Sequence, residues 1–455
     1  MKDPAAGTAW APGPTERESL SSWRQYIGSL ECPHYCGLVV QGVEGCRVRV
    51  LLSFVGGTGH AEPMVPIAHV LRDAGHTVAF VGHPRYLPAL EARGFLSFEV
   101  DGQLATGRRH LEGAPLERRP LLEPNQLDED RVLRRHYATE VPRRRVGRYL
   151  ELYDTWAPDL VIRDEVDFAA AVLTDELDIP HAVVLVLAAG SFIRPEVVAG
   201  PLDQLRAERG LAPDPDLAAL QRGLVLSPFP PSFRDPASPL PATAHSFRAP
   251  LPSSGAERDS LPSWWARLEG RPVVHVTLGT VFATESGDLF ARLLTGLGQL
   301  PVEVVVTVGR DINPAEFGLQ PEHVHVEQWV RQSLLLPHTD LVVSHGGSGT
   351  VIAALAHGLP QVVIAMGADQ MHNADRVKAL GVGRALHPVT TTAAEIRDTV
   401  AALLTDDGAQ SAAQRMQREI SALPGLDSAL TLLETEARQS SKPGDATDDG
   451  DRRRS

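Results

Sequence analysis

The feature that most constrains how this chain can fold is the alternation of short apolar runs with amphipathic runs, because it occurs twice. The first round extends from RVRVLLSFV at 47–55 to HAVVLVL at 181–187, and the second from PVVHVTLG at 272–279 to PQVVIAM at 360–366. Apolar strands separated by helices pair in parallel through right-handed crossovers. The pattern predicts an α/β fold with two Rossmann-like domains whose parallel sheets face a cleft, where such folds bind ligands.

The domain boundaries are predicted from changes in composition. A stretch at 105–150 is charged and helical in pattern, whereas 228–262 is so rich in Pro and Ser that it is predicted to be a linker. The last residues are too polar to form a core and are predicted to be disordered. The expected division is an N-terminal extension at 1–45, a first domain at 46–227, the interdomain linker at 228–262, a second domain at 263–437 and a tail at 438–455.

The overall charge indicates small partners rather than polymers. The chain has 455 residues and a formal net charge of -14, whereas nucleic acids and acidic lipids bind clustered Lys and Arg. The basic runs at 143–145 and 452–454 are short and are interpreted as solvated surface. No apolar run of about 18 residues and no signal-peptide core is present. We therefore expect a cytoplasmic protein that neither binds nucleic acid nor spans a membrane.

All three cysteines, Cys32, Cys36 and Cys46, lie near the N-terminus. Together with His34 they offer four soft metal ligands, but their spacing fits no common zinc pattern. Unligated thiols in a reducing compartment are the simpler interpretation.

The stretch SHGGSGT at 344–350 interrupts an apolar run and is followed at once by an amphipathic helix pattern. One interpretation is a plain tight turn. The other is a site where glycines let backbone amides at a helix N-terminus hold an anion. No Lys follows the glycines, so the stretch is not a Walker P-loop, and Ile352 stands where a dinucleotide-binding motif needs its third glycine.

The residues around this turn carry a specific resemblance. The segment QWVRQSLLLPHTDLVVSHGGSGTVIAALAHGLPQVVIAMGADQMHNADRV at 328–377 contains W-x-x-Q, the H-G-G turn, G-L-P, and D-Q followed by Asn, in that order. It resembles the nucleotide-sugar signature of the inverting GT-B glycosyltransferases, above all bacterial enzymes that decorate secondary metabolites. The likeness extends over about 47–430 and is strongest in the C-terminal half.

The resemblance implies a role for each matching residue. The Trp329 ring would stack on the nucleobase and the backbone of Val330 would bind its edge, although a core Trp is the alternative. The ribose or a phosphate would be held by Gln332. The diphosphate would be held by His345 and the helix N-terminus, assisted by Thr280 from a neighbouring strand. The donor-binding set implied is Thr280, Trp329, Val330, Gln332, His345, Gly347, Ser348, Gly349, Thr350, and, for the sugar hydroxyls, Asp369 and Gln370.

One position departs from many relatives. Eight residues after the motif histidine these relatives carry a Glu that binds the ribose, and here Ala353 stands there. Bacterial relatives that use TDP-deoxysugars often lack this Glu, so TDP is favoured over UDP.

The resemblance also implies the catalytic residues. His60 occupies the histidine of the pattern G-x-G-H-x-x-P and would act as general base, to which histidine is suited at neutral pH. Asp164, at the end of DLVIRD, would orient this imidazole and favour its protonated form. The alternatives are a solvent-facing cap histidine and a simple helix cap.

Metal-dependent transfer would need a D-x-D at a strand end. The two internal candidates, at 128–130 and 214–216, lie in a helical stretch and in a loop, so a metal-independent enzyme without a cofactor is expected. Residues 100–150 and 188–235 would wall the acceptor site, and LVLAAGSFI at 185–193 would supply apolar surface to it, although an apolar core strand explains this run as well.

The sequence thus predicts an inverting glycosyltransferase that moves a sugar, favoured as a deoxysugar, from TDP or UDP to a small-molecule aglycone. The alternatives are a UDP-glucose-dependent enzyme that inactivates a drug or toxin, and a catalytically silent auxiliary partner of another transferase. A homodimer or an auxiliary protein as partner stays open.

Overall fold

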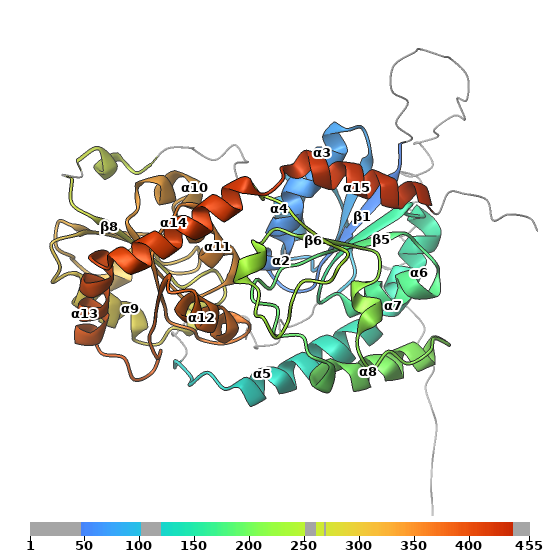
Figure 1. Cartoon of the computed structure of the whole chain (residues 1–455), viewed down its shortest axis with the longest axis horizontal. Coiled ribbons are helices and arrows are strands. Elements are labelled where there is room, and N and C mark those ends of the chain that lie inside the picture. Colours follow the sequence, from blue (N-terminus) through green and yellow to red (C-terminus); the bar gives the residue numbers. More distant parts are fainter. Residues whose placement is uncertain (1–46, 102–119, 251–260, 268–269, 440–455) are drawn as a thin grey trace, which may run out of the picture. The chain divides into compact units, whose positions relative to one another are not determined.

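The computed structural model of the chain describes residues 47–101, 120–250, 261–267 and 270–439. The expected N-terminal extension, the three cysteines and tail residues 440–455 lie outside this range. Two parallel sheets with helices confirm the predicted α/β class (Figure 1).

The first sheet has seven strands in the order β3-β2-β1-β4-β5-β6-β7, all paired in parallel. The central strands β1 and β4 are buried almost throughout, as expected for apolar runs covered on both faces. The strands are β1 (Arg49–Ser53), β2 (Thr77–Gly82), β3 (Leu96–Glu99), β4 (Leu160–Asp164), β5 (His181–Val184), β6 (Leu224–Ser227) and β7 (Ala244–Ser246).

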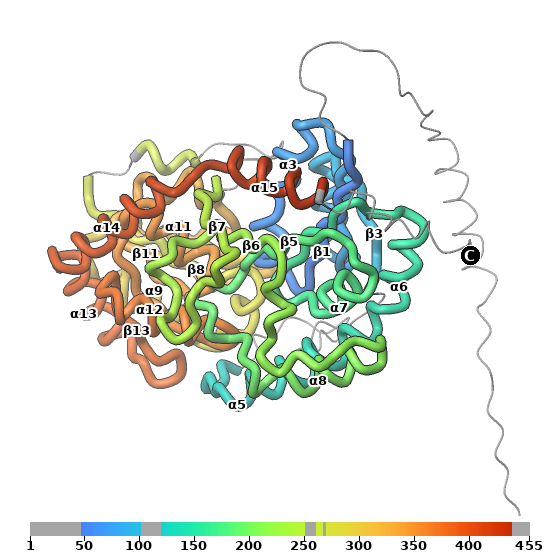
Figure 2. Tube along the Cα trace, turned by 45° about the vertical axis from the view of Figure 1, so that its right-hand side comes forward, coloured from blue at the N-terminus to red at the C-terminus, as the bar shows by residue number. Residues whose placement is uncertain are grey.

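The helices of this half follow the predicted alternation. The charged stretch is helical from Gln126 onward, where a π-helical run, Leu133–Glu140, joins two α-helices and packs against α8 (Figure 2). The helices are α2 (Thr58–Ala61), α3 (Val65–Asp73), α4 (Leu87–Glu91), α5 (Gln126–Val132), α6 (Val141–Trp156), α7 (Phe168–Glu176) and α8 (Pro195–Glu208).

The second sheet has six parallel strands in the order β10-β9-β8-β11-β12-β13. Its strands are β8 (Val273–Thr277), β9 (Glu303–Thr307), β10 (Val324–Glu327), β11 (Leu341–Ser344), β12 (Gln361–Val363) and β13 (Gly383–Ala385). Its helices are α9 (Leu289–Leu297), α10 (Gln332–Leu335), α11 (Ser348–Ala356), α12 (Gln370–Ala379), α13 (Ala393–Leu404) and α14 (Asp407–Ala422).

The segment expected to be a linker contributes to the first sheet. Residues 244–246 form its edge strand β7, and Phe233 is completely buried. Proline is tolerated at an edge strand because the missing N–H is not needed by a further neighbour. The Pro and Ser density therefore marked a sheet edge as well as a connection.

The last helix, α15 (Leu426–Gln439), returns to the first half of the chain. It lies along α3, and Ala429, Leu433 and Ala437 belong to the same buried core as β1 (Figure 1). The His76 ring is 3.2 Å from a carboxylate oxygen of Glu434. The sequence assigned this helix to the second domain, because an amphipathic pattern does not identify the surface that a helix covers.

No helix among the described residues is long and apolar enough to cross a membrane.

Candidate active site

His60 and Asp164 form a hydrogen-bonded pair at the carboxyl edge of the first sheet. His60 lies in α2, just after β1, and its Nδ1 is 3.0 Å from Oδ2 of Asp164, the last residue of β4. The Asp164 side chain is fully buried and also accepts from the N–H groups of Val55 and Val166, both at 2.9 Å. Three donors therefore fix this carboxylate against the imidazole.

The hydrogen bonds determine which ring nitrogen of His60 is basic. A carboxylate only accepts, so Nδ1 carries the proton that faces Asp164 and Nε2 keeps the lone pair. Burial opposes protonation of the ring, but the hydrogen bond and charge of Asp164, with the charges of Asp369 and Glu165, outweigh it and raise the pKa of His60. The pair has the arrangement of a general base held by a carboxylate.

The backbone beside His60 needs a glycine. Gly56 has a φ of +107°, and a Cβ at this position would lie 2.9 Å from Cδ2 of the His60 ring. The glycine therefore permits both the left-handed turn after β1 and the close approach of the imidazole.

The turn after β11 holds a second histidine in a different environment. His345 is 9% exposed, and a Cβ on Gly279 or on Gly347 would lie 2.6 Å from its Nε2. Its Nδ1 is buried and has no hydrogen-bond partner among the described residues. A buried polar atom without a partner calls for an explanation, and nine other side-chain atoms of the described residues share this feature.

Burial lowers the pKa of His345 to about 4. The ring is therefore neutral at pH 7 without a ligand, and in that form it can hold an anion as a hydrogen-bond donor. The positive end of the site is the N-terminus of α11, where the N-cap residue Gly347 provides no side-chain hydrogen bond. The first N–H groups of this helix, from Ser348 to Thr350, thus lack a side-chain cap.

The hydroxyl of Ser348 has partners within the protein. Its Oγ donates to Oδ2 of Asp369 at 2.7 Å and accepts from the N–H of Ala188 at 2.8 Å. For an incoming diphosphate, Ser348 therefore offers its backbone N–H in this conformation. Gly349, the next residue, is exposed, and Thr350 is partly exposed.

Asp369 and Gln370 stand at the start of α12. The Asp369 pKa is raised by burial, which outweighs the hydrogen bonds from Ser348 and Asn373. Gln370 is 2% exposed, and its Oε1 accepts from the N–H groups of Met366 and Gly367. The charge of Asp369 acts on His60, so the two predicted sites lie near each other.

The remaining predicted donor residues occupy the same edge of the second sheet. Trp329 follows β10, is 42% exposed, and has the guanidinium carbon of Arg310 at 4.9 Å from its ring centroid. Val330 is buried against Val305, and Gln332 begins α10. These positions suit a base-stacking ring beside a backbone contact.

Thr280, predicted on the donor side, contacts the first half of the chain. Its hydroxyl oxygen is 3.3 Å from that of Thr58, which begins α2 two residues before His60. The edges of the two sheets that carry the predicted residues are thereby in contact.

Sequence reasoning left two buried residues of this region without a role. Asn373 is completely buried, and its side chain bonds Gly346 O, Asp369 Oδ2 and the N–H of Ala189. Glu165, 9% exposed, accepts from two backbone N–H groups after β5. In the sequence, Asn373 is the Asn that follows the D-Q pair, and Glu165 is the carboxylate next to Asp164.

The structure also describes Ala353 and the D-x-D-like run at 128–130. Ala353, where many relatives carry Glu, is buried beside Leu336 and Val342. Among the described residues, no group of three or more His, Cys, Asp and Glu side chains could hold a metal ion. Asp128 and Asp130 of the D-x-D-like run instead form ion pairs with Arg131 and Arg194.

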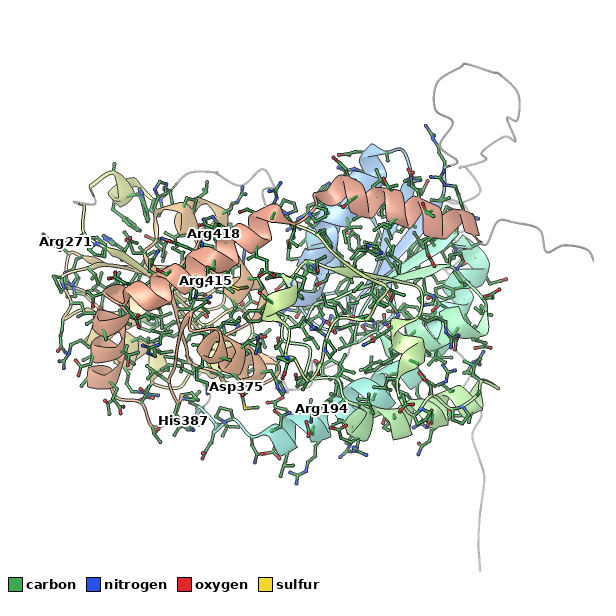
Figure 3. All side chains as sticks on the ribbon, in the orientation of Figure 1. Arg194, Arg271, Asp375, His387, Arg415 and Arg418 are labelled. Atoms are coloured by element: carbon green, nitrogen blue, oxygen red, sulfur yellow. The ribbon has the colours of Figure 1, made fainter. Side chains whose placement is uncertain are left out.

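The segment 185–193, expected to give apolar surface to an acceptor, is largely packed. Val186, Leu187, Ala188 and Ala189 are all buried, and Val186 and Leu187 pack with Phe168. Further along, Arg194, labelled in Figure 3, donates to both carboxylate oxygens of Asp130 at 2.7 Å. In this structure the segment is a core connection between β5 and α8.

Similarity to known proteins extends over most of the chain. Residues 291–430 match the family model described as "Erythromycin biosynthesis protein CIII-like, C-terminal domain". The chain is 30% identical over 380 residues to L-demethylnoviosyl transferase from Streptomyces niveus, covering 81% of this chain and 92% of that protein. It is 28% identical over 424 residues to 4'-demethylrebeccamycin synthase from Lentzea aerocolonigenes, covering 85% and 99%.

Among solved structures, a spinosyn rhamnosyltransferase complexed with thymidine diphosphate has the same fold. Its TM-score is 0.70 at 23% identity, and the match covers 85% of this chain and all of that one.

Proposed function

This chain belongs to the natural-product GT-B glycosyltransferases, and we propose that it transfers a deoxysugar from TDP to a hydroxyl group of a small-molecule aglycone, with inversion at the anomeric carbon. The observation that carries the proposal is the His60–Asp164 pair, whose Nδ1 to Oδ2 distance is 3.0 Å, in a half of the chain that contacts, through Thr58 and Thr280, the half with the uncapped N-terminus of α11. A base and an anion site are the two parts that such a transfer needs.

In the proposed step, Nε2 of His60 takes the proton of the acceptor hydroxyl while its oxygen bonds to the anomeric carbon. The bond between that carbon and the diphosphate oxygen breaks on the opposite face, and TDP leaves with the electron pair. The proton makes His60 an imidazolium, which the adjacent Asp164 carboxylate stabilises. Attack from the face opposite the leaving group accounts for inversion.

The leaving diphosphate would be held without a metal ion. The N–H groups of Ser348, Gly349 and Thr350 begin a nine-residue helix, whose dipole favours negative charge. The neutral ring of His345 would add one donor. We therefore expect EDTA to leave the transfer rate unchanged.

Two observations support TDP over UDP, and a third supports a deoxysugar. The ribose-binding Glu of many relatives is replaced by the buried Ala353. A spinosyn rhamnosyltransferase with the same fold was solved with thymidine diphosphate. The names of similar proteins, such as tylactone mycaminosyltransferase from Streptomyces fradiae, 28% identical over 416 residues, describe transfer of deoxysugars to natural products.

Calorimetric titration of the full-length protein with TDP and with UDP tests the donor. We expect TDP to bind at least about tenfold more tightly, a difference of about 1.4 kcal/mol. Tighter binding of UDP would instead favour the UDP-glucose-dependent enzyme, and binding of neither would refute the proposed activity. Transfer from TDP-α-D-glucose to a panel of macrolactone and aromatic polyketide aglycones, with the anomeric product assigned by NMR, tests inversion.

A further inference from the structure

Four consecutive backbone N–H groups after β5 are all bound by side chains. Val186 and Leu187 each donate to Oε1 of Glu165 at 2.6 Å. Ala188 donates to Oγ of Ser348 at 2.8 Å, and Ala189 to Oδ1 of Asn373 at 3.2 Å. We call residues 186–189 the amide segment.

The amide segment joins the two halves of the chain through these bonds. Its four residues are buried, so each N–H needs a partner within the protein. Two of these N–H groups donate to one oxygen of Glu165, which follows Asp164 directly, and the other two donate to Ser348 and Asn373 in the second half. The same short segment thus contacts the neighbour of the proposed base pair and the residues that hold Asp369.

Asn373 has more acceptors within reach than it has hydrogens. Its Nδ2 lies 2.9 Å from Gly346 O, 2.9 Å from Asp369 Oδ2 and 3.1 Å from Ser348 Oγ. An amide nitrogen carries two hydrogens, so it cannot fully satisfy three acceptors at once. A change at any one acceptor therefore redistributes the other bonds.

Of these three acceptors, Asp369 is the one that a bound donor sugar is expected to contact. Its Oδ2 already accepts from Ser348 and from Asn373, and it is the residue expected to bind hydroxyls of the donor sugar. A sugar hydroxyl that donates to this same oxygen, whose two lone pairs are already used by Ser348 and Asn373, would compete with the amide hydrogen of Asn373. The released hydrogen would then be available to Gly346 O and Ser348 Oγ, and the bonds from Asn373 to these two atoms would become stronger. Gly346 belongs to the turn after β11, and Ser348 binds the amide segment.

We infer that Asn373 is a positioning residue that couples occupation of the donor-sugar site at Asp369 to the amide segment 186–189. The inference rests on the proposed function, because it needs a sugar at Asp369. A bound donor sugar fixes Ala188 and Ala189 through Ser348 and Asn373. The same segment then fixes Glu165, which is the neighbour of Asp164 in the proposed general-base pair. TDP, which carries no sugar, does not produce this effect.

Hydrogen–deuterium exchange of the full-length protein tests the coupling. We expect TDP-glucose to slow exchange of the Ala188 and Ala189 amides by about tenfold more than TDP does, as one additional buried hydrogen bond would. If TDP and TDP-glucose give the same exchange there, the coupling is refuted while the donor site stands. If neither ligand binds, the proposed function fails first.

Variants of Asn373 separate positioning from folding. In Asn373→Ala, and in the equally sized Asn373→Asp, the sugar-dependent slowing should disappear, and the ratio of the TDP-glucose Kd to the TDP Kd should rise about tenfold. TDP affinity is measured in parallel, because Asn373 also bonds Gly346 O in the diphosphate turn, and the ratio of the two Kd values removes any effect common to both ligands. A variant that keeps both the slowing and the ratio would overturn the role of Asn373.

Gln361→Leu is the matched control. Gln361 is a completely buried carboxamide on β12 whose Nε2 donates to Val351 O at 3.2 Å, away from Asp369 and the amide segment. Its loss should lower the melting temperature and leave the exchange difference and the Kd ratio as in the wild type. Equal losses in Gln361→Leu and Asn373→Ala would mean that any buried amide has this effect, which also overturns the inference.

Discussion

Two histidines occupy comparable turns in the two halves of the molecule and have opposite pKa shifts. His60 follows β1 and bonds a buried carboxylate, so its pKa is raised although burial opposes protonation. His345 follows β11 and packs against glycines, so burial lowers its pKa to about 4. The comparison teaches that the partner, not the position after a strand, decides whether such a histidine takes up a proton.

The difference fits two different tasks. A general base needs to accept a proton near neutral pH, which the carboxylate beside His60 favours. A donor that stays neutral can hydrogen-bond a diphosphate without a change in its protonation. The predictions below test whether the two histidines differ in this way.

The largest effect is expected from His60→Ala. Loss of the base should lower kcat for transfer from TDP-glucose by about 10²–10⁴-fold, the usual contribution of general base catalysis. TDP affinity by calorimetry should be unchanged, because the diphosphate contacts lie in the other half. His245→Ala, at an exposed position on β7, is the control. Unchanged turnover in His60→Ala would remove the base assignment.

Asp164→Asn should have the next largest effect. We expect a fall in kcat/KM of about 10²-fold, since the imidazolium loses its stabilising carboxylate. The rate requires neutral His60, so it rises with pH through the pKa of this group. Because Asp164 raises that pKa, the variant should have its acid limb at lower pH than the wild type. A pH profile of kcat/KM in which the limb stays in place would contradict the assignment.

In the second half, Gly347→Ala should weaken TDP binding about tenfold. The added Cβ would lie 2.6 Å from Nε2 of His345, so the ring or the helix N-terminus must shift. Calorimetry with TDP measures the effect. The control is Gly147→Ala in α6, where a Cβ meets nothing within 4 Å. Equal TDP affinities in the two variants would show that the close packing of His345 is unimportant.

The smallest effect is expected from Arg310→Gln. The guanidinium carbon lies 4.9 Å from the Trp329 ring centroid, a cation–π contact at a half-exposed site. Its loss should weaken TDP binding about two- to fivefold by loosening the ring that stacks on the base. Turnover at saturating donor should stay at the wild-type level, and a drop in kcat would place Arg310 in the transfer step instead.

Much of the fold was predictable because it depends on local patterns. Buried parallel strands are continuous apolar runs, and the helices between them have amphipathic periods. The strand β6 was missed because it is short and is followed directly by prolines, so its assignment depends on pairing with β5. The charged stretch at 105–150 indicated a helix but not its interruption by a π-helical run.

The candidate site was predictable where the chain itself brings residues together. His345 and the N-terminus of α11 are neighbours in sequence, and the motif spacing indicated Asp369 and Gln370. The protonation states were not predictable, since the pKa of a histidine depends on burial and on partners distant in sequence. The bonds from Ala188 and Ala189 to Ser348 and Asn373 span 160 and 184 residues, so no local pattern indicates them.

The sequence by itself determined the α/β class and the two rounds of alternating strands and helices, because these depend on short-range periodicity, and its motif spacing indicated the candidate site residues. Tertiary structure alone decided that α15 completes the core of the first half, that His60 has a raised pKa and His345 a lowered one, and that Asn373 links Asp369 to residues 186–189. The reason is that burial, charge proximity and hydrogen-bond partners arise only when segments far apart in the chain meet.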